Sequence, residues 1–317
     1  MDTKNYGIKP QQDIDQQSDY IKSLLKEAAG PLIKVLGNDP ETTWKEAQST
    51  YTKVFENAYP LPDGVKITQI KMGNVPAVLI TPENYQGDTT MFYIHGGGYV
   101  SGSAMMYVNL AAKFALRLNT KVYIPDYRLA PEFPYPTPLE DTFEAYQWLM
   151  ESGCNTDRLT IAGDSAGGAM VITMMVKGRN KGIKLPAAAI ALSPWANIEN
   201  NGKSMNNRNR LDPFVTKEIL DAMADTFLNG IHPSDADASP IYADVRNLPP
   251  TLILIGENEI MLSDAIDLAR HLAENRVRVN LEVWPGLFHV WPQYAPNLKE
   301  SDQAIKNIVR FITDQMC

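Results

Sequence analysis

A serine in a Gly-x-Ser-x-Gly pattern is the side chain of this 317-residue sequence best suited to chemistry; it stands in the run Gly163-Asp164-Ser165-Ala166-Gly167-Gly168. A strand-like apolar run, 159–162, comes directly before it, and a second apolar run, 169–176, follows. A serine on so sharp a strand-to-helix turn is strained, and the flanking glycines lack the Cβ atoms that would clash there. The following helix directs free N–H groups and its positive dipole end at the hydroxyl. Such a turn can simply join a strand to a helix, but the pattern favours Ser165 as a nucleophile that attacks acyl compounds.

Three consecutive glycines follow another strand-like run, Thr90–Ile94, in the stretch His95-Gly96-Gly97-Gly98-Tyr99. Glycines are entropically costly, and a flexible linker would be longer and more polar than this run, which apolar residues frame. The better explanation is that bare backbone N–H groups approach a ligand closely, as in glycine loops that supply an oxyanion-hole donor. We therefore expect the N–H groups of Gly97, Gly98 and Ala166 to stabilise a tetrahedral intermediate. Losing one such donor typically costs about 3–4 kcal/mol.

The chain has four histidines, so the base for this serine can be sought by elimination. His95 belongs to the glycine loop and is expected to hold it. His232 lies in a turn-rich segment with no strand before it, and His271 falls on the polar stripe of a predicted helix, where we expect it to be solvated. A histidine among large apolar residues, such as His289, is often a plain core residue. Its place on a loop after the last strand-like run makes His289 the predicted base.

The acid of a serine triad on such a turn falls between the serine and the histidine in the chain. The strand-like run Thr251–Gly256 is followed by Glu257 and Glu259, and Asp264 comes soon after. Glu259 is predicted to hold the imidazole of His289 in the right tautomer and to stabilise its cation. Asp264 has a structural explanation, because it opens a helix and complements the helix dipole. Glu257 directly follows the strand, where a solvated carboxylate is expected; both remain alternatives.

Together these stretches resemble the hormone-sensitive-lipase-like family (family IV) of α/β-hydrolase carboxylesterases. The resemblance extends from about residue 60 to the C-terminus and rests on the glycine loop, the nucleophile motif and two further runs, Asp126-Tyr127-Arg128-Leu129-Ala130-Pro131-Glu132 and Ser193-Pro194-Trp195. It implies hydrolysis of small or medium carboxylic esters without a metal or an organic cofactor.

Two positions depart from the pattern of the resembled family. An aspartate with proline and leucine behind it is common at the acid position, whereas this chain has Glu259-Ile260-Met261-Leu262-Ser263-Asp264. A branch of the family that includes lactone hydrolases resembles this glutamate variant, so activity is expected to persist. Asn197 stands where an aspartate often follows the tryptophan. In the resembled family this position lies where the core joins a helical lid, called the cap, so the asparagine is expected to affect substrate preference rather than the chemical step.

The elements that position these residues follow from hydrophobic periodicity. Strand-like runs alternate with helical patterns, which predicts parallel strands joined by crossover helices. An antiparallel hairpin is expected from 65–71 and 75–80 around a Gly-Asn turn. Helices are predicted at 108–118, 139–151, 166–177, 264–275 and 302–314. With the resemblance, this gives an expected α/β-hydrolase fold, a mostly parallel central sheet with helices on both faces and a helical cap.

Two stretches lie outside this alternation. Residues 1–55 are polar at first and then helical at 20–36 and 44–55, and residues 196–237 hold an Asn/Arg-rich run and a helix at 216–228. In the resembled family such pieces form a lid above the serine, which excludes water and shapes the pockets. From the residues alone, surface decoration is equally compatible. The expected division is an N-terminal cap segment at 1–55, core at 56–195, a cap insertion at 196–237 and core at 238–317.

The formal net charge is −8 with a pI near 5.1, and no long Lys/Arg cluster exists, which argues against nucleic acid or an anionic membrane as a partner. No run approaches a membrane span, and no apolar signal segment follows the start. Cys154 and Cys317 are too few for a disulfide framework and indicate a cytoplasmic location. No cluster of histidine and cysteine supports a metal. A homo-oligomer remains possible.

The sequence thus predicts a serine carboxylesterase that acts on short- to medium-chain esters through an acyl-enzyme. A lactone, aryl-amide or formamide hydrolase of the same fold is the alternative. A peptidase of this fold usually adds a large gating domain, for which there is no room, and a ligand-binding pseudoenzyme would have damaged machinery. Several aromatic and methionine side chains are either plain core or the lining of a pocket: Trp44, Met105, Met106, Tyr107, Trp195, Phe214 and Phe288.

Overall fold

The computed structural model describes residues 11–58, 61–209, 211–213, 215–294 and 298–316. Its strands are β1 (Val65–Met72), β2 (Val75–Pro82), β3 (Thr90–Ile94), β4 (Lys121–Pro125), β5 (Leu159–Asp164), β6 (Ala188–Leu192), β7 (Thr251–Gly256) and β8 (Val279–Trp284). Its α-helices are α1 (Gln11–Leu36), α2 (Trp44–Ala58), α3 (Val108–Leu118), α4 (Thr137–Glu151), α5 (Ala166–Asn180), α6 (Ser204–Asn207), α7 (Lys217–Leu228), α8 (Leu262–Glu274) and α9 (Lys299–Gln315). Short 3-10 helices lie at Met105–Tyr107, Thr156–Arg158, Pro240–Tyr242 and Trp291–Tyr294.

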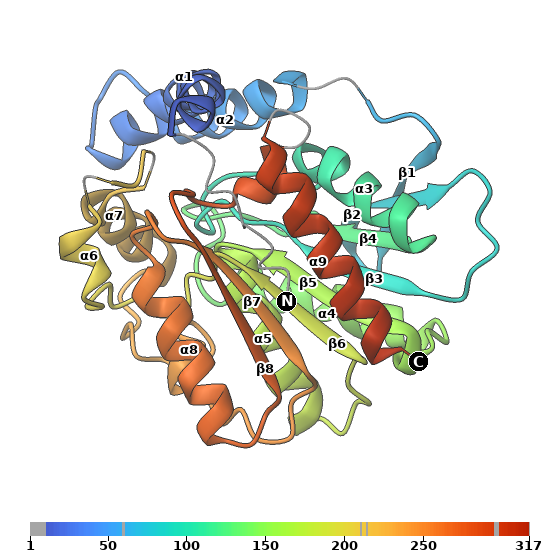
Figure 1. The fold of residues 1–317 in the computed structure, drawn as a ribbon. Coiled ribbons are helices and arrows are strands. Elements are labelled where there is room, and N and C mark those ends of the chain that lie inside the picture. The colour runs from blue at the N-terminus through green and yellow to red at the C-terminus, as the bar shows by residue number, and fades with distance from the viewer. Residues whose placement is uncertain (1–10, 59–60, 210, 214, 295–297, 317) are drawn as a thin grey trace, which may run out of the picture.

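Within the described residues, eight strands form one twisted sheet in the order β1-β2-β4-β3-β5-β6-β7-β8 (Figure 1). β2 pairs antiparallel with β1 and with β4, whereas the other neighbouring pairs are parallel, as expected for a mostly parallel sheet. The carboxyl ends of parallel strands lie along one edge of a sheet. The loops after β3, β5, β7 and β8 therefore gather there, and these loops carry the glycine run, Ser165, Glu259 and His289.

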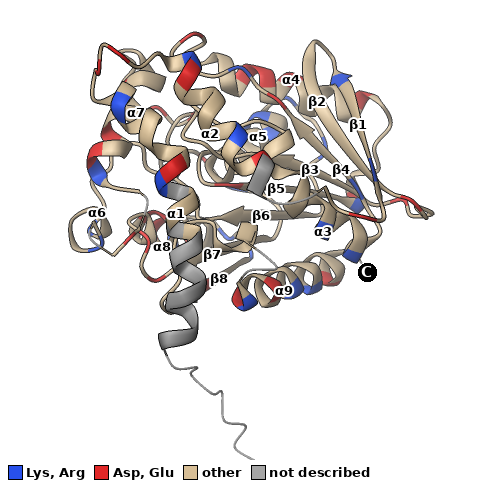
Figure 2. Ribbon diagram, turned by 90° about the horizontal axis from the view of Figure 1, so that it is seen from above, with Lys and Arg blue, Asp and Glu red and all other residues tan. Residues whose placement is uncertain are grey.

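Helices cover both faces of the sheet. α3 and α9 pack together over one face, and α4 and α5 pack together over the other (Figures 1 and 2). Right-handed crossovers between parallel strands explain this division, because a helix changes face when the chain reverses its direction along the sheet. The step from β3 to β4 runs one way, and the steps from β4 to β5 and from β5 to β6 run the other. The predicted helices on both faces are thus confirmed.

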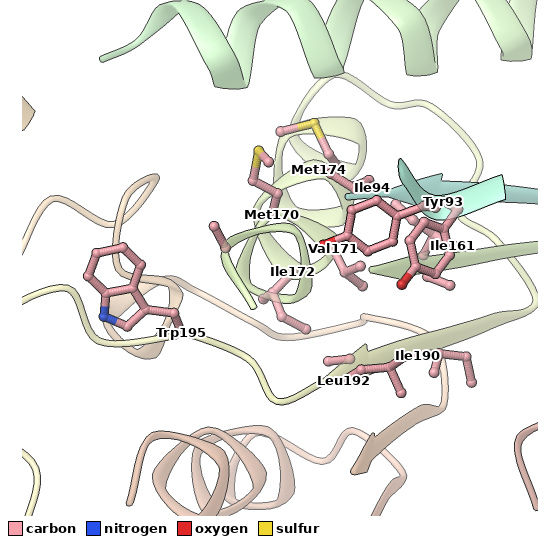
Figure 3. Close-up of a cluster of buried hydrophobic side chains, with 14 of the residues drawn as sticks. Tyr93, Ile94, Ile161, Met170, Val171, Ile172, Met174, Ile190, Leu192 and Trp195 are labelled. Carbon is pink, nitrogen blue, oxygen red and sulfur yellow. The ribbon is translucent and has the colours of Figure 1, made fainter. Parts of the chain in front are cut away.

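The core beneath the nucleophile turn lies between α5 and the central strands. Figure 3 shows Met170 and Met174 of α5 in one cluster with Ile161 of β5 and Ile190 of β6. All four side chains are fully buried, and β5 and β6 are buried along their whole length. A helix that is apolar on every side belongs in a core, and α5 is buried from Ala166 to Val176. The turn between β5 and α5 therefore rests on rigid elements.

Helices from the two stretches outside the alternating pattern meet near the edge of the sheet where the parallel strands have their carboxyl ends. α1 packs on α2 and also contacts α7 (Figure 1). The side-chain amide of Gln48, on α2, donates to the carbonyl oxygens of Val100 at 2.9 Å and Ala130 at 3.0 Å. Because Val100 lies two residues after Gly98, α2 is attached to the loop that the sequence assigns to the oxyanion hole.

The predicted hairpin and most of the predicted helices are confirmed with shifts of at most three residues at their ends; α9, for example, begins at Lys299 rather than at residue 302. The exception is α1, which begins at Gln11 rather than at residue 20, within a stretch that the sequence marks only as polar. Strand β6 is not indicated by the sequence pattern, because three of its five residues are alanine, which has a low strand preference. Burial between β5 and β7 overrides that preference. Among the described residues, no helix combines the length and the apolar composition that a membrane crossing needs.

Candidate active site

Ser165 occupies the turn between β5 and α5, with φ 53° and ψ −121°. A residue with a side chain is strained in this left-handed region of φ. Two backbone hydrogen bonds fix the turn: the N–H of Ser165 donates to the carbonyl oxygen of Leu192 at 2.8 Å, and its own carbonyl accepts from the N–H of Trp195 at 3.1 Å. The predicted strained turn is therefore confirmed, and Ser165, 7% exposed, lines a cavity.

Two glycines make room for close backbone contacts, one at the nucleophile turn and one within the glycine loop. A Cβ atom on Gly167 would lie 2.1 Å from the carbonyl oxygen of Ile94, at the end of β3. Gly97 has φ 113°, and a Cβ atom there would lie 2.0 Å from the carbonyl oxygen of Ser101. No side chain fits at either position: at Gly167 the chain after β3 approaches too closely, and at Gly97 the glycine loop turns back onto its own residue Ser101.

The loops leave three backbone donors unused near the serine. In the part of the chain that the structure describes, the N–H groups of Gly97, Gly98 and Ala166 donate to no protein acceptor. Gly97 and Gly98 line the cavity together with Ser165, and Ala166 is the first residue of α5. Buried backbone donors without a partner are rare in folded proteins. This arrangement is suited to an oxyanion held beside Ser165.

Asp164 links the nucleophile strand to the glycine loop. Its carboxylate accepts hydrogen bonds from the hydroxyls of Tyr93 at 2.9 Å and Tyr107 at 2.8 Å, and from the N–H of Gly96 at 3.1 Å. Burial raises the pKa of Asp164 to about 6, although the donors of Tyr107, Tyr93 and Gly96 act in the opposite direction. The sequence pattern gives this aspartate no role of its own; only its position beside the serine could have drawn attention to it.

The stretch around Tyr127 supports the glycine loop from a third side. The hydroxyl of Tyr127 donates to the carbonyl oxygen of His95 at 2.9 Å, and the two rings stack with their centroids 4.1 Å apart. Nδ1 of His95 lies 2.7 Å from the carbonyl oxygen of Gly96. Burial lowers the pKa of His95, against the raising effect of Asp126 and the hydrogen bond to Gly96. His95 therefore holds the loop, as the sequence predicts.

The predicted base and the predicted acid meet at the ends of two paired strands. His289 follows β8 and Glu259 follows β7, and Nδ1 of His289 lies 2.9 Å from Oε2 of Glu259. The other carboxylate oxygen accepts from the N–H of Gly256 at 2.6 Å and from the hydroxyl of Ser193 at 2.8 Å. Glu259 is fully buried, whereas His289 lines the same cavity as Ser165. A buried carboxylate bonded to an imidazole at the cavity wall is the arrangement that a general base requires.

The pKa of His289 is raised above its ordinary value by its acidic neighbours. Burial acts to lower this pKa, but the hydrogen bond and the charge of Glu259, with the charges of Asp212 and Asp164, outweigh burial. These three carboxylates come from the loop after β7, from the segment before α7 and from the end of β5. The protonated form of this imidazole is therefore stabilised by all three carboxylates.

The alternative acids lie elsewhere. The carboxylate of Asp264 accepts from the N–H of Asn197 at 3.0 Å. That of Glu257 accepts from the N–H of Gly286 at 3.2 Å and lies 3.9 Å from the guanidinium of Arg208. Among the described residues, no carboxylate other than Glu259 is hydrogen-bonded to the imidazole of the base.

Two further histidines lie away from the cavity. His232 is exposed, with Nδ1 2.7 Å from the hydroxyl of Ser234. The expectation that His271 is solvated is wrong, because Nε2 lies 2.7 Å from the carbonyl oxygen of Ala243 and the ring is half-buried. Ile266, an apolar residue on the same helix, is 44% exposed, so α8 turns the side that carries Ile266 towards solvent.

A small cavity of about 40 Å³ lies beside Ser165. Most of its walls come from α2, α7 and the loops at the catalytic edge: Tyr51, Phe55, Val215, Ile219, Leu220, Met223, Met261, Val290, Gln293 and Tyr294. Of the side chains proposed from the sequence, Tyr107 and Trp195 line it, and Phe214 lies outside the described residues. Within the described ranges, no three His, Cys, Asp or Glu side chains are grouped to hold a metal ion.

Known proteins resemble this chain over most of its length. A family model described as the alpha/beta hydrolase fold matches residues 91–293. An acetyl-hydrolase of Streptomyces hygroscopicus is 35% identical over 246 residues, covering 78% of this chain and 81% of that protein. The carboxylesterase/phospholipase LipF of Mycobacterium tuberculosis is 30% identical over 264 residues, covering 79% and 70%. A solved esterase of the bacterial hormone-sensitive lipase family has a TM-score of 0.88 at 35% identity, covering 98% of this chain and 100% of that one.

Proposed function

The chain belongs to the hormone-sensitive-lipase-like family (family IV) of α/β-hydrolase carboxylesterases, and we propose that it hydrolyses esters with Ser165, His289 and Glu259 as its triad. The observation that carries the proposal is the 2.9 Å contact between Nδ1 of His289 and Oε2 of Glu259, beside the cavity that Ser165 lines. A carboxylate at Nδ1 keeps a proton on that nitrogen and leaves Nε2 free to accept another.

In the first half of the reaction, the hydroxyl oxygen of Ser165 attacks the ester carbonyl carbon and Nε2 of His289 takes the hydroxyl proton. The carbonyl oxygen becomes an oxyanion, which accepts hydrogen bonds from the N–H groups of Gly97, Gly98 and Ala166. The imidazolium then gives its proton to the departing alkoxide, and the alcohol leaves behind an acyl-enzyme.

In the second half, His289 removes a proton from water as the water oxygen attacks the acyl carbon. The same N–H groups hold the second oxyanion. When the bond to Ser165 breaks, the imidazolium returns the proton to the serine oxygen, and the carboxylic acid is released. Glu259 keeps its negative charge throughout and stabilises the imidazolium in both halves.

The proposed substrates are esters of short to medium acyl chains. Apolar side chains of α2 and α7, including Phe55, Leu220 and Met223, line the cavity beside the serine. A small, mainly apolar cavity favours a compact acyl group, whereas a long lipid chain needs an extended groove. Because α2 and α7 line this cavity, we propose the division expected from the resemblance: residues 1–55 and 196–237 form the cap, and residues 56–195 and 238–317 form the core.

The low cysteine content supports a cytoplasmic location, which cell fractionation can test.

A panel of p-nitrophenyl esters from acetate to palmitate, with lactones alongside, tests the substrate class. We expect the highest kcat/KM on a short or medium acyl chain and little turnover of palmitate. A preference for palmitate would contradict the compact pocket. Faster turnover of lactones than of any linear ester would instead indicate a lactone hydrolase, as in the branch of the family that resembles this chain in having glutamate at the acid position.

Covalent labelling tests the nucleophile separately from the substrate. Phenylmethylsulfonyl fluoride should inactivate the enzyme with one sulfonyl group per chain, because the serine oxygen displaces fluoride. Peptide mass spectrometry should locate the label on Ser165. Inactivation with the label on another residue would refute the assignment.

A further inference from the structure

Glu259 sits in a closed set of hydrogen bonds, of which only one reaches the base. Oε2 contacts His289, while Oε1 accepts from the N–H of Gly256 and from the hydroxyl of Ser193. The carboxylate is fully buried. A carboxylate out of reach of water keeps its charge only when hydrogen-bond donors replace the water. Among these donors, the Ser193 hydroxyl is the one side chain besides the imidazole.

The hydroxyl of Ser193 joins the acid to the loop of the base. It donates to Oε1 of Glu259 at 2.8 Å and accepts from the N–H of Val290 at 3.1 Å. Val290 is the residue directly after His289. Because the backbone N–H can only donate, the proton of the hydroxyl must point at the carboxylate. The hydroxyl oxygen of Ser193 therefore fixes the rotation of the Glu259 carboxylate and also the backbone position of Val290, next to the base.

The backbone holds Ser193 in place at a cost. Ser193 follows β6 with φ 45°, and Val290 has φ 50°. Both lie in the left-handed region, where non-glycine residues are strained and a β-branched residue is a genuine outlier. The N–H of Ser193 donates to the carbonyl oxygen of Leu254 in β7 at 2.7 Å. Glycine would adopt this backbone conformation without strain, yet the chain has serine here. We infer that the hydroxyl of Ser193 is needed.

We propose that Ser193 is a positioning residue of the reaction, whose hydroxyl fixes the carboxylate of Glu259 against Nδ1 of His289 and ties the loop of the base to it. This role rests on the proposed triad. Ser193 is fully buried and lies outside the lining of the cavity. It therefore acts on the reaction through Glu259 and His289 and not through contact with the ester.

Replacing Ser193 should lower kcat and leave KM nearly unchanged, because the substrate-binding walls stay intact. Hydrogen bonds to charged groups are the stronger class, so we expect kcat to fall about 10- to 100-fold in Ser193→Ala. Ser193→Gly removes the same hydroxyl but suits the left-handed backbone, so it should show the same kinetic loss in a protein that folds readily. KM should stay within about threefold in both variants.

The pH profile distinguishes a positioning role from a purely structural one. The carboxylates facing the imidazole are Glu259, Asp212 and Asp164. Without the hydroxyl, the carboxylate of Glu259 is less well held and supports the imidazolium less. The acid limb of the pH profile of kcat/KM should therefore move to lower pH in both Ser193 variants. The downfield proton resonance of the His289–Glu259 hydrogen bond should shift or broaden in parallel.

Ser239→Ala provides a matched control. The hydroxyl of Ser239 is equally buried, donates to the carbonyl oxygen of Pro233 at 2.7 Å and accepts from the N–H of Ile198 at 2.9 Å. Its loss should lower stability to a similar degree while kcat and the acid limb stay as in the wild type. If the Ser193 variants keep kcat within about threefold, or lose activity only as Ser239→Ala does with an unmoved acid limb, the positioning role is wrong.

A double variant separates this inference from the proposed triad. If Ser193 acts through Glu259, then Ser193→Ala should cost little further activity in a Glu259→Gln background. Independent, multiplying losses would overturn the positioning role. Full activity in Glu259→Gln alone would instead refute the triad.

Discussion

The carboxylate of Asp264 accepts a hydrogen bond from the backbone N–H of Asn197 at 3.0 Å, which ties the first turn of α8 to the chain beyond β6. Asp264 is therefore occupied by a structural contact, although it stands close to Glu259 in the sequence. Glu257 is half-exposed and bonds the turn after β8. Neutralising each of the three carboxylates should have distinct consequences.

Glu259→Gln should lower kcat on the order of 10³- to 10⁴-fold, with KM little changed. The two donors at Oε1, from Gly256 and Ser193, require an oxygen there, so the new amide nitrogen must face Nδ1 of His289. Nδ1 then has to accept, which places the imidazole proton on Nε2 and leaves no base for the serine. Steady-state kinetics on p-nitrophenyl butyrate provide the check, with Glu257→Gln as the control. A larger loss in the control would mean that Glu257 is the acid.

Asp264→Asn should change the pH dependence of stability and leave kcat within about threefold. Burial, aided by the charge of Asp267, raises the pKa of Asp264 well above its ordinary value. Above about pH 4 the unfolded carboxyl has lost its proton while the folded one keeps it, so the wild type loses stability as pH rises towards the folded pKa. The asparagine removes this loss. Urea unfolding should therefore show that the stability of the variant rises relative to that of the wild type as the pH increases above about 4. A difference that does not change with pH would contradict this account.

The acid limb of kcat/KM should lie above pH 6.5. His289 works as the neutral base, and its pKa is raised above the ordinary value near 6.5, so activity should fall as pH drops through that higher value. In Glu259→Gln, burial still lowers this pKa while the bond and charge of Glu259 are lost. The limb of the residual activity should then move to lower pH. An unmoved limb would show that another group controls it.

Ser165→Ala and His289→Ala should each lower kcat by a factor on the order of 10⁴–10⁶, and the double variant should lose little more. The members of a triad act as one unit, so removing the second adds almost nothing. Thermal unfolding should show that both variants remain folded. Unchanged turnover in either single variant would refute the assignment of nucleophile or base.

Leu220→Ala should move the preference towards longer acyl chains. Leu220 is buried on α7 and lines the cavity, so truncation enlarges the space above the serine. The ratio of kcat/KM for octanoate to that for butyrate should rise. Leu228→Ala is the control, because Leu228 lies buried on the same helix outside the cavity lining. Both variants should lose about 2–5 kcal/mol of stability. If the ratio of kcat/KM for octanoate to that for butyrate changes equally in both, Leu220 does not limit the acyl chain as part of the cavity wall.

The nucleophile turn and the glycine loop are predictable from the sequence because their geometry restricts residue types locally. A left-handed serine between a strand and a helix needs small neighbours, and Gly167 leaves no room for a Cβ atom. The apolar periodicities of strands and of helices are also local, so the sequence shows that the two kinds of element alternate. Such alternation predicts a mostly parallel sheet. His289 follows by elimination among four histidines.

Other parts of the site depend on contacts between distant segments. The sequence left three carboxylates open, and the contact between Glu259 and His289 arises from the pairing of β7 with β8. The side chains of α2 and α7 at the cavity wall were not predicted, because an amphipathic pattern shows which face is apolar and not what it covers.

The sequence by itself therefore predicted the candidate nucleophile, the candidate backbone donors and the order of the elements apart from β6, since each of these patterns is local in the chain. Only the tertiary structure decided which carboxylate reaches the imidazole and that the hydroxyl of Ser193 joins the two loops. Those choices depend on distances between strand ends that are far apart in the chain, and no local pattern encodes such distances.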